Sequence, residues 1–115
     1  MEAFLQKIQT IPEVAELILR VEEGGCPAAV TGLQAVQRAC VGAAVARGTG
    51  RPAVFLCGDE RECRTLAADL SALTGEEAVV LPGREWQLRP GAVASREWER
   101  SRLGALYRLS RGEAR

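Results

Sequence analysis

Histidine is absent from this sequence of 115 residues, and none of its four cysteines belongs to a CxxC pair (Cys26, Cys40, Cys57 and Cys63). Histidine is the commonest general base, so neither a serine nor a cysteine has its usual catalytic partner in this chain. The cysteine spacing also argues against a structural metal site. We therefore expect no catalytic residue, no metal and no cofactor, and we expect reduced thiols that act as small apolar side chains.

Net charge and long apolar runs are missing as well. Lys and Arg number 15, as do Asp and Glu, so the formal net charge is zero and gives no overall attraction to nucleic acid. No apolar run approaches the ~20 residues that cross a bilayer. The N-terminus, MEAFLQKIQ, lacks the basic start and apolar stretch of a signal peptide. These absences predict a cytoplasmic protein that does not contact a membrane.

Apolar residues make up 47% of the chain, which is enough for one folded domain over residues 1–115. Helical spacing and capping signals predict helices at both ends and between short apolar runs. Thr10 is predicted to cap the second helix, with Pro12 in its first turn, and Asp59 is predicted to cap a later helix. The predicted segments are N-terminal helices at 2–23, a β-α-β-α-β core at 28–81, a loop at 82–94 and a C-terminal helix at 95–111.

The core is predicted to contain a parallel sheet. Its strands are the short runs at 28–31, 53–57 and 78–81. The run at 53–57 is apolar throughout and shows no alternation, as expected of a strand covered on both faces. Strands that alternate with helices imply right-handed crossovers. The sequence therefore predicts an α/β fold with three layers, in which a mainly parallel sheet has helices on both faces.

The turn at Gly32 occupies the position of a phosphate loop in such a fold. A working loop reads G-x-x-x-x-G-K-[ST], because backbone N–H groups and a lysine surround the phosphates while a hydroxyl holds magnesium. Here Gln37 replaces the second glycine, Arg38 the lysine and Ala39 the hydroxyl residue. We interpret this as a degenerate loop that binds no cofactor. The alternative is a small phosphate- or nucleotide-binding domain that uses the turn from Gly32 to Arg38.

The last predicted helix begins with Ser95 as its cap and carries both apolar and basic residues. Its apolar face is assigned to Trp98, Leu103, Ala105, Leu106 and Leu109, and its basic face to Arg96, Arg100, Arg102, Arg108 and Arg111. With the preceding loop, this helix supplies a predicted interaction surface of Arg84, Trp86, Arg89, Arg96 and Arg100. A nucleic-acid-binding module that uses these arginines is a further alternative.

Three stretches together resemble one family. They are IPEVAELILRVEEGGCP, AAVTGLQAVQRACVGAAVARGTGRPAVFLC and ALTGEEAVVLPGREWQLRPGAVASREWERSRLGALYRL. They resemble the N-terminal segment of the bacterial transcription-repair coupling factor (Mfd), and the resemblance covers nearly the whole chain. Its most specific part is LPGREWQLRPGAVASREWERSRLGAL, and a VTGL turn without a working G-K-[ST] is also typical of the family.

The resemblance implies an incomplete P-loop NTPase-like module, similar to domain 1a of UvrB, that does not use nucleotide. The full-length family protein is implied to be an ATP-dependent DNA translocase. It binds double-stranded DNA, displaces stalled RNA polymerase and recruits nucleotide-excision repair through UvrA. Because no motor is present here, the chain alone is expected to be a non-catalytic scaffold and not an enzyme.

The resemblance further implies that the chain is a piece of a larger multi-domain protein whose sheet is incomplete. An exposed sheet edge pairs readily, so we expect marginal stability or self-association through that edge. The residues expected to hold the module together are Gly32 at the turn, Val54 to Leu56 in the central strand, and Trp98 with Leu106 beneath the last helix.

Overall fold

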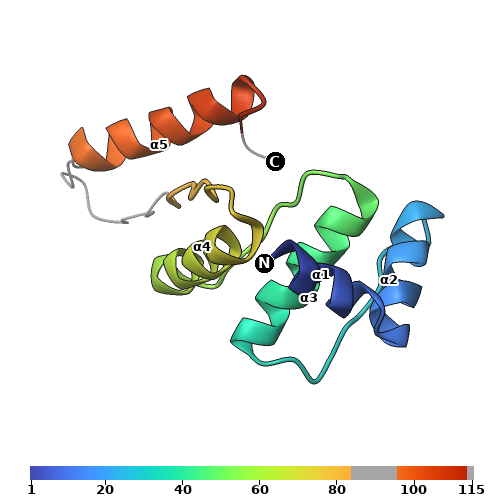
Figure 1. Cartoon of the computed structure of the whole chain (residues 1–115). Helices are drawn as coiled ribbons and strands as arrows, with labels where there is room; N and C mark the ends of the chain where they lie inside the picture. The colour runs from blue at the N-terminus through green and yellow to red at the C-terminus, as the bar shows by residue number, and fades with distance from the viewer. Residues whose placement is uncertain (84–95, 114–115) are drawn as a thin grey trace.

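The computed structural model describes residues 1–83 and 96–113, and within them the chain forms five helices and no strand. Figure 1 shows α1, α2 and α4 around α3, while α5 stands apart from the other helices. The predicted α/β fold is therefore wrong, because the described part of the chain is all-α. The helices are α1 (Glu2–Gln9), α2 (Pro12–Glu22), α3 (Ala35–Thr49), α4 (Glu60–Thr74) and α5 (Arg96–Ser110).

The three predicted strands are extended connections between helices. Within the described residues, no backbone hydrogen bond joins the segments 28–31, 53–57 and 78–81 to one another. The predicted parallel sheet and its exposed edge are thus absent from this part of the molecule. Runs this short carry too little periodicity to separate a buried strand from a connection. The burial that we assigned to a sheet comes instead from helices that pack on α3.

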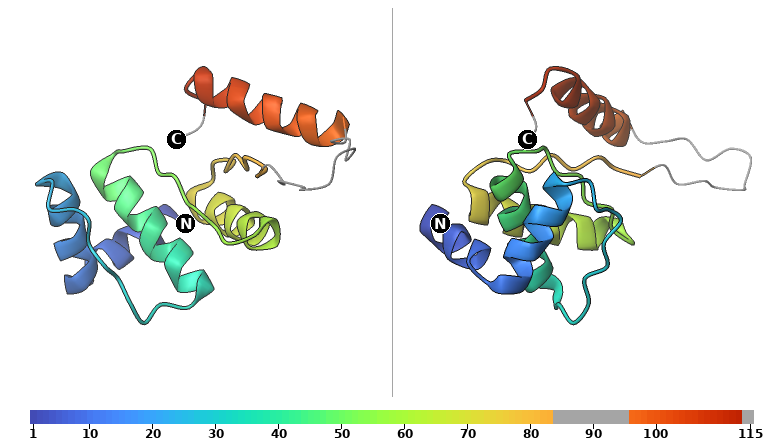
Figure 2. Two further views of the ribbon diagram at one scale, coloured as in Figure 1. Left: turned by 180° about the vertical axis from the view of Figure 1, so that it is seen from behind. Right: turned by 90° about the vertical axis from the view of Figure 1, so that its right-hand side faces the viewer.

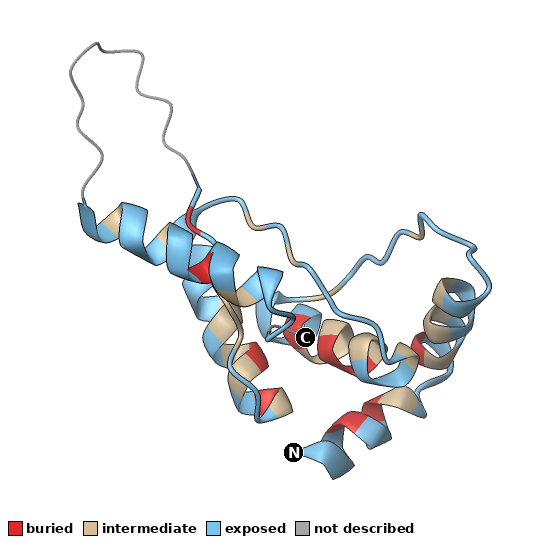
Figure 3. Ribbon diagram, turned by 90° about the horizontal axis from the view of Figure 1, so that it is seen from above, coloured by how far each residue is buried: buried red, intermediate tan, exposed pale blue. Residues whose placement is uncertain are grey.

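The core forms where the other helices meet the small residues of α3. Ala39 and Ala44 are fully buried, and so is Leu5 of α1, which is the largest side chain without exposure. Figure 3 places the buried positions on the facing sides of these helices. At Gly42 an added Cβ would lie 2.5 Å from Cε1 of Phe55, so this glycine allows the 53–57 connection to approach α3. The small residues do permit close packing, but mainly against helices.

Several local predictions about helix ends are confirmed and one is wrong. The Asp59 side chain accepts a hydrogen bond from the Glu62 N–H at 2.7 Å, as the capping pattern predicts. Pro12 stands in the first turn of α2, where its missing N–H leaves no helical bond unmade. Thr10 does not cap α2; its hydroxyl instead donates to the Lys7 carbonyl, because Thr10 already follows the end of α1.

Of the residues expected to stabilise the fold, only some do so. Gly32 makes the turn with φ of +81°, a conformation that favours glycine. Val54 and Leu56 are instead 86% and 96% exposed, because the described residues form no sheet around them. On α5 the buried residue is Ala105, whereas Leu106 is 41% exposed.

None of the helices in the described ranges has the length and apolar character needed to span a bilayer.

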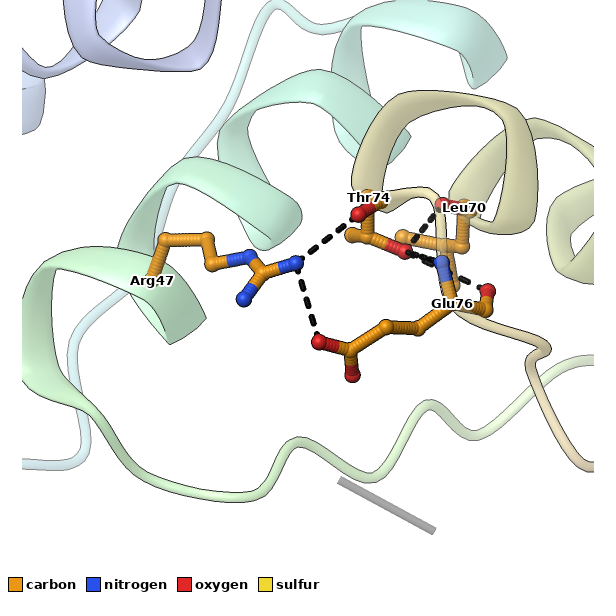
Figure 4. A network of polar contacts seen from close by, with 4 residues as sticks. All are labelled: Arg47, Leu70, Thr74 and Glu76. Atoms are coloured by element: carbon orange, nitrogen blue, oxygen red, sulfur yellow. Dashed lines mark hydrogen bonds and ion pairs between the residues drawn. The ribbon is translucent and has the colours of Figure 1, made fainter. Parts of the chain in front are cut away.

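A polar network joins the ends of α3 and α4 (Figure 4). Arg47 donates to the Thr74 carbonyl at 2.8 Å and pairs with the Glu76 carboxylate at 3.1 Å. The Thr74 hydroxyl donates to the Leu70 carbonyl at 2.8 Å and accepts from the Glu76 N–H at 3.2 Å. Carbonyls in the last turn of a helix have no partner within the helix, and the Arg47 guanidinium supplies a hydrogen bond to one of them. Its positive charge also interacts favourably with the negative end of the α4 dipole.

We expect Arg47→Met to lower the free energy of unfolding by about 1 kcal/mol, since it removes a charge-assisted hydrogen bond at a partly exposed site. Urea unfolding followed by circular dichroism measures the change. Arg64→Met is the matched control, because Arg64 also pairs with a glutamate, Glu60, but within one exposed helix. The control should lose about 0.3–0.5 kcal/mol. Equal losses in the two variants would show that the contacts of Arg47 with Thr74 and Glu76 add no more stability than an exposed ion pair within one helix.

Candidate functional site

The degenerate phosphate-loop position lies at the N-terminus of α3. Gly32 turns the chain, Gln34 precedes the helix, and the Gln34 N–H donates to Oε1 of Gln37 at 2.9 Å. The residue that replaces the second glycine therefore serves as a local cap. Its side chain fills space at the helix start, where backbone approaches phosphate in a working loop.

The next two residues of the motif face different surroundings. Arg38 is exposed and its guanidinium lies 3.8 Å from the Glu62 carboxylate of α4. Ala39 is fully buried in the core. Because Ala39 lies in the core, only position 38 of these two is open to a ligand at the start of α3. The structure thus brings Arg38 to a carboxylate and Ala39 to apolar side chains.

The Cys57 thiol, just before the start of α4, has an unfavourable electrostatic environment for catalysis. Burial raises the pKa of the Cys57 thiol, and its hydrogen bond to Cys63 and the nearby charges of Glu62 and Asp59 act in the same direction. A thiol with a raised pKa stays protonated near neutral pH and is a weak nucleophile. No group of His, Cys, Asp or Glu in residues 1–83 and 96–113 is arranged to hold a metal ion.

A shallow polar depression lies beside the C-terminal end of α5. Its volume is about 440 Å³, and it is lined by Glu76, Glu77, Arg108, Gly112 and Glu113. Glu76 pairs with Arg47, and Glu77 pairs with Arg108 at 3.1 Å. These ion pairs balance most of the negative charge in the depression, so its lining does not select a cation.

One face of helix α5 contacts the segment that follows α4, at residues 77–83. The Trp98 ring N–H donates to the Gly83 carbonyl at 3.1 Å, and Arg102 donates to the Pro82 carbonyl at 2.5 Å. Arg108 pairs with Glu77. Within the described residues α5 packs against no other helix. Figure 2 shows from two further directions that it runs beside this segment and away from the α1–α4 cluster.

The opposite face of α5 carries a stripe of exposed basic and apolar side chains. Arg96, Arg100, Leu103 and Tyr107, which we call the outer stripe, lie within about 60° of one another around the helix axis. Leu103 is 66% and Tyr107 is 60% exposed. Arg96 and Arg100 are exposed and make no ion pair with a described residue. The Arg111 guanidinium lies 5.7 Å from the Tyr107 ring centroid and extends the stripe by one turn.

The outer stripe overlaps the predicted interaction surface only in part. Arg96 and Arg100 lie together on it, whereas Arg84, Trp86 and Arg89 lie outside the described residues, as does Ser95. Arg102 and Arg108, which we assigned to the basic face, turn inward to Pro82 and Glu77. Leu103 and Tyr107 were missed as members of this surface. Their helical spacing from Arg96 and Arg100 was the available signal.

Comparison with protein-family models, with curated proteins and with solved structures finds no match for this chain.

Proposed function

We propose that this chain is a non-catalytic scaffold module, the N-terminal part of a transcription-coupled DNA repair translocase that displaces stalled RNA polymerase and recruits nucleotide-excision repair proteins. The repair context rests on the sequence resemblance alone, because the described residues lack the sheet that the resemblance implies. One structural feature supports the non-catalytic role. At the phosphate-loop position Ala39 is fully buried while Arg38 pairs with Glu62, so a hydroxyl at residue 39 would face the core and not magnesium.

The outer stripe of α5 is the surface to which we assign binding. Arginine and tyrosine are enriched among the residues that dominate protein interfaces, and an exposed leucine between them adds apolar area. Two arginines one turn apart suit an acidic patch on a partner. UvrA is the protein partner that the resemblance implies for this end of the family protein. We therefore propose that the outer stripe contacts an acidic surface of UvrA, while RNA polymerase and double-stranded DNA are bound elsewhere in the full-length protein.

Reversing both charges of the stripe, Arg96→Glu with Arg100→Glu, is expected to weaken UvrA binding by at least about tenfold, because both cations then repel the acidic patch. Isothermal titration calorimetry of purified UvrA with the chain measures the affinity. Lys7→Glu with Arg61→Glu reverses the same number of exposed charges on α1 and α4 and serves as the matched control. The control should change the affinity less than about twofold, since neither position touches α5.

Three results would contradict the proposal. One is an equal loss of UvrA affinity in the stripe variant and the control. Another is binding to double-stranded DNA whose steep salt dependence is lost in the stripe variant, which supports a nucleic-acid-binding module instead. The third is saturable binding of magnesium ATP that Arg38→Ala abolishes, which supports the nucleotide-binding alternative.

A further inference from the structure

The connection between α3 and α4 has the side-chain pattern of a strand, but no described residue forms a strand beside it. Along residues 54–57 the exposure alternates: Phe55 and Cys57 are half-buried, while Val54 and Leu56 are 86% and 96% exposed. Phe55 packs against α3 at Gly42. Two large apolar side chains therefore share one open face, and the chain between them is held in place by Phe55.

The backbone of this connection is equally open. No N–H or C=O group of residues 51–57 makes a hydrogen bond with another described residue. The Gly58 N–H, by contrast, donates to the Glu62 carboxylate at 2.9 Å. Pro52 has no N–H group. An exposed, extended apolar segment with free backbone groups is a template for pairing with another strand.

We propose that two copies of this chain associate through this segment, which pairs with itself as antiparallel strands about a two-fold axis at Phe55. This proposal is independent of the proposed repair function. It also differs from the predicted pairing of a sheet edge, because no sheet forms in the described residues. The two-fold relation places Phe55 opposite Phe55 of the second copy, and each residue then meets the one equally far from Phe55 on the other side.

This register satisfies the charges and the backbone together. Arg51 and Asp59 lie four residues from Phe55 on either side, so each Arg51 meets the Asp59 of the other copy. If the two Phe55 residues form a hydrogen-bonded pair, then Ala53 and Cys57 also bond across the axis. Pro52 and Gly58 then occupy the alternate positions, where an N–H points away from the partner. Proline lacks that group, and the Gly58 N–H is already bonded to Glu62.

The same register pairs the two exposed apolar side chains. Val54 of each copy lies opposite Leu56 of the other, on the face that is open in a single chain. Cross-strand pairs of this kind are the stabilising unit of antiparallel sheets. Phe55 and Cys57 stay on the face that packs against their own helices. A second copy of the chain therefore complements this segment in charge, in backbone pattern and in side-chain size.

Sedimentation equilibrium over a concentration series tests the proposal, and wild type is expected to show a monomer–dimer equilibrium. Ala53→Pro removes one N–H···O bond from each copy and should weaken the dimer by at least about tenfold. The monomer should keep its helical circular dichroism, since Ala53 is exposed and makes no hydrogen bond. Arg61→Asp is a control outside the segment and should leave dimerisation unchanged, whereas Arg51→Asp should weaken it. A monomer at every concentration, or a dimer that Ala53→Pro leaves intact, would overturn the proposal.

Disulfide trapping tests the register. Cα atoms of a hydrogen-bonded antiparallel pair lie about 5.5 Å apart, within the range of a disulfide. Ala53→Cys should therefore form a covalent dimer through Cys57 of the second copy under mild oxidation, and peptide mass mapping identifies the link. Within one extended chain these two residues are too far apart to join. Adding Cys57→Ser should abolish the link, and Val54→Cys should not form it. A dimer linked at other positions, or an unlinked one, would contradict the register.

Discussion

Leu5→Ala is expected to lower the free energy of unfolding by about 2–5 kcal/mol, the range for a buried leucine whose removal leaves a cavity. Leu5 has no exposed surface and is the largest side chain buried to that degree. The helix that carries it, α1, has eight residues, which is too short to be stable alone, so its contacts with α3 must hold it in place. Because small domains have only about 5–15 kcal/mol of stability, the loss should be evident in urea unfolding.

The neighbouring residue supplies the control for this prediction. Phe4 precedes Leu5 on the same helix but is 47% exposed, so Phe4→Ala should cost less than about 1 kcal/mol. Leu5→Met keeps most of the volume and should lose under about 1.5 kcal/mol. If Leu5→Ala unfolds the chain completely, the methionine variant still gives a measurable midpoint. Similar effects at Leu5 and Phe4 would contradict the packing of α1 on α3.

The helices could be predicted because their signals are local. For α4, the cap at Asp59, the apolar residues up to Leu73 and the glycine at Gly75 all act within one segment. Gly75 adopts φ of +71° and its N–H bonds to the Ser71 carbonyl, which is how a helix commonly ends. No knowledge of the rest of the chain is needed for such assignments. The predicted order of the helices is therefore confirmed, as are the approximate bounds given for the N-terminal helices and the last one.

The partners of those helices could not be predicted, because packing depends on residues distant in sequence. A helix with Ala39, Ala43 and Ala44 on one side can approach a sheet or another helix equally closely, and the residues themselves do not distinguish the two. The run around Phe55 is apolar throughout, so its sequence gives no sign that Val54 and Leu56 face outward. Strands need neighbours, and no local signal reports whether a neighbour is present.

The outer stripe of α5 was predicted only in part, because the residues of this helix were not placed by their angle around its axis. Residues in α5 were sorted by chemistry, with apolar residues on one face and arginines on the other. Angular position around the helix separates them differently, because Leu103 falls with Arg96 and Arg100, while Arg102 turns toward Pro82. Long arginine side chains can bond to backbone carbonyls at a buried face, so charge alone does not assign a helical residue to solvent.

Ala44→Leu is expected to lower the free energy of unfolding by about 1–3 kcal/mol, because it adds a large side chain where no space exists. Ala44 is fully buried, and its carbonyl accepts a hydrogen bond from the Gln9 side chain of α1 at 3.0 Å. A leucine at this position must push α1 away from α3 and so breaks that contact as well. Differential scanning calorimetry should record a midpoint lower by about 4–12 °C.

Ala35→Leu is the matched control, since the same substitution is made on the same helix at an exposed position. Alanine and leucine have similar helix propensities, so the control should shift the stability by less than about 0.5 kcal/mol. The difference between the two variants isolates the space between α1 and α3 from any effect on α3 itself. If Ala44→Leu is as stable as wild type, the small residues of α3 do not set the distance between these helices. The burial of Leu5 would then need another explanation.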